Sequence, residues 1–530
     1  MTGAAAGRAG PRRVDDLAAL GAALFGEAPA LVEDARTLDY RRLAAAVSDT
    51  AALLGRLGVR RGDRVLVVNE NCAAALVLAL AANRCDAWPV LVNARLAARE
   101  IDAIREHCRP RRAFFTVEVS ADAQAHATRS AAEPLVRAEL GAGALAGLGA
   151  VAVAPCDEAA APEPVPDDPA AAVGTLIYTS GTTGAPKGVM LSHANLLFAA
   201  RSGATLRRVG PGDRVYGALP ISHVFGLASV ALSSLLAGAA MHLVPRFTAE
   251  GFAAALAEEG VSVVPGVPAM YARLLDHARR SGRTIAAPRA RFLYAGGAPL
   301  DPQLKADVER EFRQPLHNGY GLTETSPSVS STRIDAPRSD LSIGPPVPGI
   351  EVRIVAAGVP VPAGEVGELH VRGPNIMLGY YRAPELTAAA VDRDGWFNTG
   401  DLARADAAGN LFIAGRSKEL IIRSGFNVYP VEVEGVLTQH PGVRQCAVVG
   451  RSVPGNEEVV AFVELGEGAT TTVAELAAFA AERLAPYKQP AEIVVLDALP
   501  ASSTGKVLKS ALAERAKTKP AAQAAARPAT

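Results

Sequence analysis

Residues 178–189 read Tyr178-Thr-Ser-Gly-Thr-Thr-Gly-Ala-Pro-Lys187-Gly-Val, a stretch rich in glycine and in hydroxyl side chains. Glycine lets backbone amides approach an anion closely, the hydroxyl groups add hydrogen-bond donors, and Lys187 adds a full positive charge. This combination suits a polyphosphate. The stretch is not a Walker loop, because no Gly-Lys-Ser/Thr closes it at the required spacing. The alternative is an ordinary glycine- and threonine-rich turn between a strand and a helix.

Alternating strands and helices surround this stretch. The pattern predicts strand 65–68, helix 72–82, strand 87–92, an amphipathic helix over 97–108, and strands 175–178, 261–264 and 290–294. Such alternation indicates βαβ units and a parallel sheet. Two regions differ from it. The glycine and proline spacing between residues 352 and 372 indicates antiparallel strands, and a capping box from Thr472 to Glu475 opens a helix in a small α+β unit.

Length, charge and cysteine content exclude several classes of protein. A chain of 530 residues is long enough for at least two domains. Its 54 basic and 54 acidic residues balance, so no field gathers nucleic acid, and we predict small-molecule partners. Five cysteines without a CxxC pair argue against a zinc site or a disulfide scaffold and favour the cytoplasm. Polar residues interrupt the apolar runs 73–92 and 228–244, which we interpret as buried core rather than transmembrane segments.

Four further motifs follow the phosphate-binding stretch. They are Tyr320-Gly-Leu-Thr-Glu324, Thr399-Gly-Asp401, Gly415-Arg-Ser-Lys-Glu419 and Leu499-Pro-Ala-Ser-Ser-Thr-Gly-Lys506. Together the five motifs resemble the adenylate-forming superfamily of acyl-CoA synthetases, aryl-CoA ligases, firefly luciferase and peptide-synthetase adenylation domains. The chain looks most similar to bacterial fatty-acid-CoA ligases and coumarate-CoA ligase-like enzymes. The resemblance runs from about Leu38 to Leu512 and implies an AMP-forming acid-CoA ligase.

The expected fold class is α/β. A large N-terminal domain of parallel-rich sheets with helices and a small barrel-like β part would precede a small, mobile α+β C-terminal domain. The predicted boundaries are a disordered tail over 1–13, an adenylation domain with the ATP and acyl pockets over 14–414, a hinge over 415–419, the mobile domain over 420–516 and a disordered tail over 517–530. We expect a monomer or homodimer, with peripheral membrane contact left open.

The resemblance assigns the nucleotide site. Lys187 and its loop would hold the β- and γ-phosphates, Thr323 would touch the α-phosphate, and Glu324 would hold Mg²⁺, because a hard cation prefers carboxylate oxygen. The alternative for Glu324 is an exposed loop acid. Tyr320 would stack on adenine, and Asp401, reinforced by Arg416, would bind the ribose hydroxyls. The predicted ATP- and AMP-binding residues are Thr179, Ser180, Gly181, Thr182, Thr183, Gly184, Lys187, Gly297, Ala298, Pro299, Asn318, Gly319, Tyr320, Gly321, Thr323, Asp401 and Arg416.

The C-terminal residues would divide two half-reactions between them. By resemblance, Lys506 steadies the charge that develops during adenylation, so the predicted catalytic residues are Lys506, Thr323, Glu324 and Lys187. The thiol of coenzyme A then needs access, which a domain swinging about the hinge residue Lys418 would provide. Gly425, Phe426 and Asn427 would line the tunnel for coenzyme A, although Gly425 alone is also compatible with an ordinary turn.

By resemblance, the segment that contains His223 lines the acyl pocket, which we predict from it and from three further short segments. Its residues are His223, Val224, Phe225, Val267, Met270, Ala295, Gly296 and Gly321. Small residues leave depth and the others are apolar, which favours an uncharged medium- or long-chain fatty acid. His223 is expected to be a pocket wall rather than a general base, because a carboxylate is already ionised at neutral pH. An aryl acid of cinnamate or benzoate type is the nearest competitor. A malonate-type acid would need a cation inside the pocket, and Arg246 and Arg273 lie nearby in sequence.

Three other activities stay open. An acyl-AMP ligase that loads a carrier protein would share every adenylation residue and differ only in its acceptor. A luciferase-like oxygenase would react further with oxygen. A non-catalytic regulator is disfavoured because Lys187, Glu324, Asp401, Arg416 and Lys506 are all present. The expected co-substrates and cofactor are ATP, coenzyme A and Mg²⁺, with a small carboxylic acid as the partner to be activated.

Overall fold

The computed structural model describes residues 10–34, 36–135, 148–180, 186–424, 426–454, 456–466, 468–501 and 507–518. The chain divides into two compact units. The first comprises Met1–Ala298, Ala306–Val352 and Val371–Phe397, and the second comprises Pro299–Lys305, Arg353–His370 and Asn398–Thr530. The predicted α/β class, with a larger N-terminal and a smaller C-terminal part, is confirmed.

The first unit contains an eight-stranded sheet in the order β15-β14-β13-β12-β10-β11-β1-β2. The inner strands pair in parallel, and β2 and β15 pair antiparallel at the two edges. Strand bounds are β1 Pro29–Glu33, β2 Arg36–Asp39, β10 Arg214–Gly217, β11 Ala240–Leu243, β12 Val263–Gly266, β13 Phe292–Ala295, β14 Leu316–Tyr320 and β15 Ser330–Ser331. Strands β12 and β13 are buried throughout, and β10 is buried after its first residue, as in parallel sheets covered on both faces.

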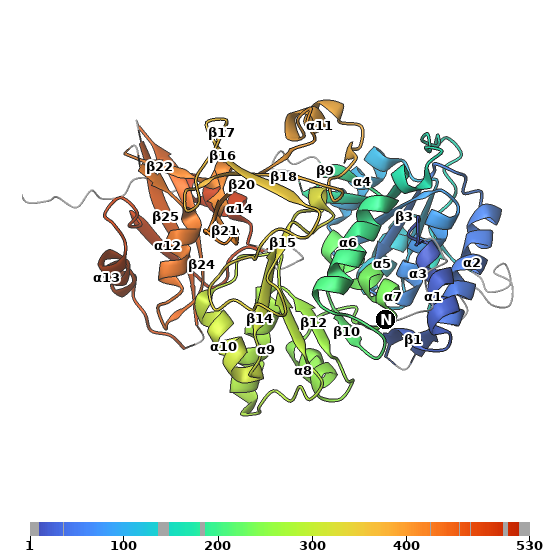
Figure 1. Ribbon diagram of the computed structural model, residues 1–530, viewed down its shortest axis with the longest axis horizontal. Coiled ribbons are helices and arrows are strands. Elements are labelled where there is room, and N and C mark those ends of the chain that lie inside the picture. Colours follow the sequence, from blue (N-terminus) through green and yellow to red (C-terminus); the bar gives the residue numbers. More distant parts are fainter. Residues whose placement is uncertain are drawn as a thin grey trace, which may run out of the picture. The chain divides into compact units, whose positions relative to one another are not determined.

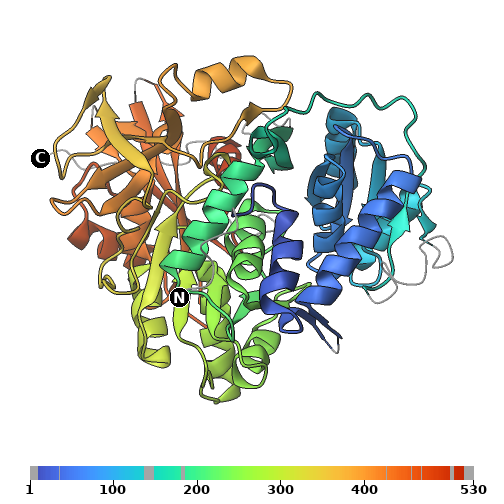
Figure 2. The same cartoon turned by 45° about the vertical axis from the view of Figure 1, so that its right-hand side comes forward.

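The first unit also contains helices outside its second sheet, of which α10 begins in the second unit. They are α1 Asp16–Phe25, α2 Tyr40–Arg56, α6 His193–Leu206, the π-helix η2 Phe225–Leu232, α7 Ser233–Ala237, α8 Ala249–Ala257, α9 Pro268–Ser281, α10 Pro302–Phe312 and α11 Pro384–Ala390. Helices α1 and α2 lie side by side (Figure 2). The structure describes residues 10–13 within the predicted N-terminal tail, where the Arg13 guanidinium pairs with Asp15 and Asp86.

A second sheet of the first unit has the order β4-β3-β5-β7-β6. It consists of β3 Arg64–Asn69, β4 Trp88–Asn93, β5 Arg112–Phe115, β6 Glu133–Pro134 and β7 Ala152–Val153, with α3 Ala73–Arg84, α4 Ala98–Cys108 and α5 Ala121–Arg129 between strands (Figure 1). The predicted strand-helix alternation is present here, and β3 pairs with β4 and β5 in parallel. Both apolar runs belong to the buried core, as predicted. No helix within the described residues combines the length and the hydropathy that crossing a membrane requires.

The second unit contains one five-stranded and two smaller sheets. The strands are β16 Glu351–Ala356, β17 Val359–Pro360, β18 Gly367–Arg372, β20 Phe397–Ala405 and β21 Leu411–Arg416 in the order β17-β16-β18-β20-β21; β22 Ile421–Arg423 with β23 Phe426–Val428; and β24 Val443–Val453, β25 Asn456–Leu465 and β26 Glu492–Leu496. The antiparallel pairing of β16 with β17 agrees with the prediction for residues 352–372.

Helices cover both faces of the β24-β25-β26 sheet. They are α12 Pro430–Leu437 and α13 Val473–Arg483 on one face and α14 Lys509–Thr518 on the other. The predicted capping box is present: the Glu475 amide donates to Thr472 Oγ1 (3.2 Å), and the Thr472 amide donates to Glu475 Oε2 (2.7 Å).

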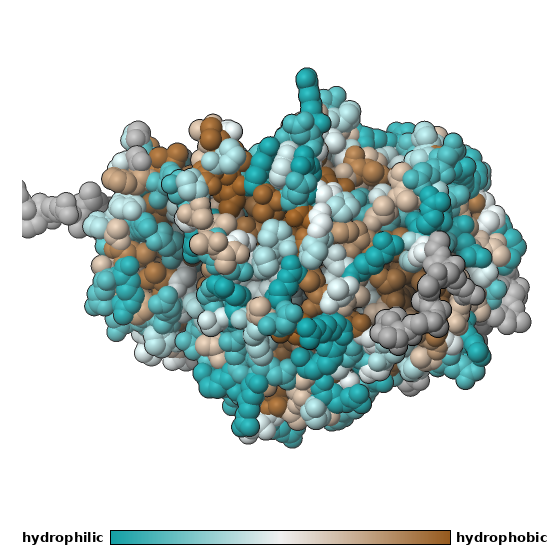
Figure 3. Space-filling model, in the orientation of Figure 1, coloured by the Kyte–Doolittle hydropathy of each residue, from teal (hydrophilic) through white to brown (hydrophobic). Residues whose placement is uncertain are grey.

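On the first unit, hydrophilic side chains predominate over the outer surface of α8 and α9 (Figure 3), as expected for amphipathic helices over a core.

Candidate functional site

The predicted phosphate-binding stretch includes the facing ends of the two strands of a β-hairpin. Strands β8 Val173–Ser180 and β9 Pro186–Ser192 pair antiparallel, with Thr179 opposite Lys187. The strand-to-helix turn considered as the alternative is therefore wrong, because a second strand follows the loop. The loop residues Gly181, Thr182, Thr183 and Gly184 lie outside the described residues. Near the loop end of β8, the Tyr178 hydroxyl lies 2.7 Å from His107 Nδ1.

Glu324 lies in a short 3-10 helix, η3 Thr323–Thr325, directly after strand β14. Thr325 Oγ1 accepts a hydrogen bond from the Leu322 amide (2.9 Å) and fixes the turn, while the Glu324 carbonyl accepts from the Met377 amide (3.0 Å). Thr323 is buried, whereas the Glu324 side chain is half-buried. The Glu324 carboxylate is therefore held by its backbone at the carboxyl end of a parallel strand, where ligands bind in α/β sheets.

Tyr380 connects Glu324 with Lys187, and the sequence analysis missed it. Its hydroxyl donates to Glu324 Oε1 (2.9 Å), and Lys187 Nζ lies 5.6 Å from the centroid of its ring. The structure therefore brings the predicted metal ligand and the predicted phosphate-binding lysine to one side chain. The sequence signal was no more than a tyrosine that follows a glycine. In the structure these two residues form strand β19 Gly379–Tyr380.

The predicted adenine and acyl segments lie at the carboxyl ends of neighbouring strands. Strand β13 leads into Gly296, and β14 carries Asn318 and Tyr320. The side-chain nitrogen of Asn318, Nδ2, donates to the Ser342 carbonyl (3.4 Å), and the side-chain oxygen Oδ1 accepts from the Gly319 backbone amide (2.9 Å). These bonds hold the Asn318 side chain in a fixed orientation on the strand that ends in Tyr320.

Several glycines in these segments are required for close packing. A Cβ on Gly321 would lie 1.3 Å from the Pro327 carbonyl oxygen, and one on Gly319 would lie 2.0 Å from Tyr294 Oη. A Cβ on Gly296 would lie 3.3 Å from the Phe225 ring. We expected the small size of Gly296 and Gly321 to leave depth in the acyl pocket. That reason is wrong, because neighbouring atoms already fill the space beside both glycines. Only Gly297, whose Cβ would be 3.6 Å from Val267 Cγ1, has room for ordinary contact.

Phe225, Val267 and Gly297 form a common apolar wall. Phe225 packs edge-on against Tyr294, with ring centroids 5.9 Å apart. Val224 is fully buried behind Phe225, and Met270 extends the wall beside Gly266. Phe225 begins the π-helix, a rare element that is frequent at functional sites and that hydropathy alone did not reveal.

His223 is half-buried at the start of this wall. Its Nδ1 accepts a hydrogen bond from the Phe225 amide (3.2 Å), so this nitrogen carries no proton. The arrangement favours a structural role at the pocket entrance over proton transfer through Nδ1.

Neither of the two arginines considered for a second substrate carboxylate is shown to face the apolar wall. Arg246 pairs with Glu70 (2.8 Å) and also with Asp122, and Arg273 is exposed on α9. A dicarboxylate therefore gains no cation from these two residues.

In the second unit, Asp401 and Arg416 face each other across β20 and β21. Arg416 Nε lies 3.1 Å from Asp401 Oδ1, as the predicted joint role requires. The amide of Asp401 donates to Thr399 Oγ1 (3.1 Å), which in turn donates to the Leu369 carbonyl (2.8 Å). Asp401 is 5% exposed, and its carboxylate position is therefore well defined.

The hinge and tunnel segments lie in the same unit. Lys418 is part of the 3-10 helix η4 Ser417–Glu419, and Phe426 and Asn427 are exposed on β23, with the Phe426 ring stacked on Tyr487. Gly425 and Lys506 lie outside the described residues. The ends of the segment that contains Lys506 are described: Ala501 bridges to Val507, and the Leu508 amide donates to the Pro500 carbonyl (2.8 Å).

Lys509 anchors the end of this segment at the first residue of α14. Its ammonium group lies 2.8 Å from Glu434 on α12 and 3.0 Å from Glu419, the residue after Lys418. The side chain is 21% exposed. Sequence reasoning missed this cluster, because Lys509 resembles any lysine on an exposed helix.

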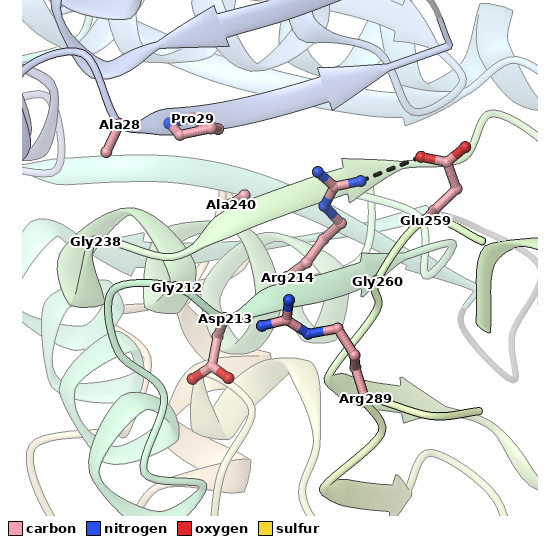
Figure 4. A pocket seen from close by; sticks show the side chains of 10 residues that line it. All are labelled: Ala28, Pro29, Gly212, Asp213, Arg214, Gly238, Ala240, Glu259, Gly260 and Arg289. Atoms are coloured by element: carbon pink, nitrogen blue, oxygen red, sulfur yellow. Dashed lines mark hydrogen bonds and ion pairs between the residues drawn. The ribbon is translucent and has the colours of Figure 1, made fainter. Parts of the chain in front are cut away.

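A surface pocket of about 170 Å³ lies at the amino ends of the strands of the eight-stranded sheet (Figure 4). It is lined by residues that precede or begin β1, β10 and β11, and Arg214 pairs there with Glu259 (3.1 Å). None of the predicted site residues lines it. The pocket is on the edge of the sheet opposite to Gly296, Asn318 and Tyr320.

Comparison with known proteins agrees with this geometry. Residues 20–381 match the AMP-binding enzyme family and residues 432–506 match the AMP-binding enzyme C-terminal domain, so the chain belongs to this family. The predicted enzyme class, an AMP-forming acyl-CoA synthetase, is likewise confirmed.

Individual relatives differ in their acids. A feruloyl-CoA synthase of Amycolatopsis sp is 36% identical over 90% of this chain and 94% of the relative. A long-chain-fatty-acid–CoA ligase of Bacillus subtilis is 38% identical over 66% of this chain and 62% of the relative. The structure of O-succinylbenzoate coenzyme A synthetase from Bacillus subtilis in complex with ATP and magnesium ion superposes with a TM-score of 0.77 at 28% identity, covering 93% of this chain and 98% of that chain.

Proposed function

We propose that this acid-CoA ligase activates a medium- or long-chain fatty acid in the cytoplasm. We also propose the domain boundaries predicted above, with a hinge over residues 415–419. The observation that carries the proposal is the apolar wall of Phe225, Val267 and Gly297. Of the two candidate cations, Arg246 is paired with carboxylates and Arg273 is exposed. An uncharged acyl chain would bury its surface there without leaving a charge unpaired.

Adenylation joins the acid to AMP. A carboxylate oxygen attacks the α-phosphorus of ATP, the bond to the bridging oxygen breaks, and pyrophosphate leaves with the electron pair. Lys187 and the hydroxyl groups of its loop hold the β- and γ-phosphates, and Thr323 holds the α-phosphate. Lys506 balances the charge that develops on the phosphoryl oxygens.

Glu324 suits a magnesium ion. One carboxylate oxygen is fixed by the Tyr380 hydroxyl, and Oε2 accepts no hydrogen bond from the described residues. Mg²⁺ is usually bound through one or two carboxylates together with substrate phosphates. When bound by Glu324, it would neutralise charge on the phosphate oxygens.

Thioester formation requires a different arrangement. The thiol of coenzyme A, having lost its proton, attacks the acyl carbonyl carbon, and AMP leaves with the electron pair of the broken anhydride bond. Lys506 must withdraw to admit the thiol, so we propose that the C-terminal domain turns about Lys418 and presents Gly425, Phe426 and Asn427 to the pantetheine arm.

An aryl acid is the second candidate. The edge-to-face pair of Phe225 and Tyr294 offers aromatic contact to a planar ring, and the related feruloyl-CoA synthase is named for such an acid. A fatty chain and a ring differ in the depth of pocket that they need.

The test uses purified protein with ATP, magnesium, coenzyme A and a panel of fatty, aryl and dicarboxylic acids. Pyrophosphate and thioester are measured separately. Val267→Trp should shorten the accepted chain, whereas Arg273→Ala, on the exposed side of the adjoining helix α9, should leave the acid profile unchanged. Preference for a dicarboxylate, or loss of its use in Arg273→Ala, would overturn the proposed acid class. Pyrophosphate without thioester would point to a carrier-protein acceptor, and oxygen uptake or light would point to an oxygenase.

A further inference from the structure

Tyr380 is fixed in place by its backbone. Strand β19 pairs antiparallel with β9, which places Tyr380 opposite Val189, two residues from Lys187. The Tyr380 amide donates to Thr387 Oγ1 on α11 (2.9 Å). The residue is 9% exposed. Its ring is therefore held beside the strand that leaves the phosphate-binding loop.

The side chain of Tyr380 makes two different polar contacts. The hydroxyl donates to Glu324 Oε1 (2.9 Å), and the ring lies 5.6 Å from the ammonium group of Lys187. A carboxylate offers only hydrogen-bond acceptors, so the neutral phenol is the donor in this contact.

Both contacts leave the charges of their partners intact. A basic residue in place of the hydroxyl would neutralise Glu324 and compete with a metal ion, and an acid in place of the ring would compete with phosphate for Lys187. A neutral donor and a ring face orient the two charged groups while preserving their affinity for a cation and an anion.

We propose that Tyr380 is a positioning residue for adenylation: its hydroxyl turns Glu324 so that Oε2 faces the magnesium ion of MgATP, and its ring holds Lys187 toward the phosphates. The inference rests on the proposed roles of Glu324 and Lys187. It assigns to Tyr380 no contact with the reacting atoms.

The neighbouring Tyr381 provides a matched control. It is also buried, and its hydroxyl also donates to a carboxylate, that of Glu163. Its ring packs on Trp88, with centroids 5.8 Å apart. The same substitution at Tyr381 therefore removes the same kind of bond from Glu163, a carboxylate that belongs to none of the motifs.

The experiment compares Tyr380→Phe, Tyr380→Leu and Tyr381→Phe in the full chain. ATP binding is titrated by calorimetry without any acid, so that no turnover occurs, in the presence of Mg²⁺ and in its absence. Tyr380→Phe should raise the Mg²⁺ concentration needed for half-maximal enhancement of ATP binding about tenfold, because partners of metal ligands typically contribute that much. ATP binding without metal should be unchanged. Tyr380→Leu should also weaken binding without metal, since the ring beside Lys187 is lost.

Tyr381→Phe should change neither quantity, and thermal unfolding should report any general loss of stability. The proposal is overturned if Tyr380→Phe needs no more Mg²⁺ than the unmodified chain, or if Tyr381→Phe reproduces its shift. These readouts require no chemical step. They therefore remain decisive for Tyr380 even if the unmodified protein releases no pyrophosphate with any acid, a result that would refute the proposed function instead.

Discussion

The residues predicted to bind the nucleotide in the first unit and the anchor of the Lys506 segment in the second unit are held in opposite ways. In the first unit, neutral groups of Tyr380 contact Glu324 and Lys187. In the second, Lys509 is held by the full charges of Glu419 and Glu434. A side chain that must bind a charged ligand cannot be neutralised beforehand, whereas a side chain that only fixes backbone gains from being neutralised.

This difference separates residues that act from residues that support. Lys509 is three residues from Lys506, yet its ammonium group is already saturated by two carboxylates, so it is a poor candidate for binding phosphate. Its partners are Glu419, the last residue of the predicted hinge, and Glu434 on α12. Lys509 can therefore tie the end of the Lys506 segment to the hinge and to α12, while Lys506 remains the lysine predicted to act in adenylation.

The largest expected effect separates the two half-reactions. Lys506→Ala should lower pyrophosphate release about a hundredfold or more, as loss of one charge-stabilising donor does, and should spare thioester formation from supplied acyl-adenylate. Gly425→Leu should do the reverse, because a side chain would obstruct the tunnel. Lys517→Ala, which removes only an exposed pair with Glu514, is the control. Loss of the same step in both variants would contradict the division between acting residues.

Lys509→Met should have a smaller, indirect effect. It leaves Glu419 and Glu434 without their cation, which should cost roughly 1 to 3 kcal/mol of stability, less than a fully buried pair because Lys509 is 21% exposed. Adenylation should fall about tenfold as the anchor loosens, with thioester formation from acyl-adenylate less affected. Thermal unfolding and the two partial reactions measure these changes.

Lys509→Arg should restore most of the adenylation rate, since a guanidinium can pair with both carboxylates. Adding Glu434→Gln to Lys509→Met should recover stability in a double-mutant cycle. If Lys509→Met lowers both partial reactions equally and Arg does not rescue them, Lys509 supports the fold in general and not the Lys506 segment.

The sequence predicted contacts between residues that lie in recognisable motifs. Asp401 and Arg416 could be assigned to one site in advance because each lies in a motif of the family that the chain resembles, and the structure adds that they lie opposite each other on β20 and β21. The strand-helix alternation from residue 65 to 108 was visible because apolar periodicity reflects burial directly.

Contacts between distant segments were not predictable in this way. Tyr380 reaches Glu324 only because β19, two residues long, pairs with β9, and so short a strand has no periodicity. The packing of Gly321 against the Pro327 carbonyl depends on backbone approach, which composition does not encode. Lys509 differs from other lysines only in its tertiary partners.

An effect on stability alone, with no change in either partial reaction, tests whether acid acts on the two units differently. In the first unit, His193 Nδ1 accepts from the Val14 amide (3.1 Å), and burial lowers the His193 pKa to about 4, helped by Arg13 and opposed by Asp86 and Asp16. The unfolded chain binds this proton near pH 6.5, so between these values it takes up more protons than the folded chain, and stability falls as pH falls. The loss can reach about 3 kcal/mol.

Lys509 responds to pH in the opposite sense. Although burial opposes it, Glu434 and Glu419 raise the pKa of Lys509, so its contribution to stability is complete at low pH and is lost only in alkali. Thermal unfolding from pH 7.5 to 4.5 should therefore show a shallower acid decline in His193→Asn, whose amide oxygen can still accept from Val14, and an unchanged acid decline in Lys509→Arg. An equal decline in His193→Asn and the unmodified chain would place the acid sensitivity elsewhere.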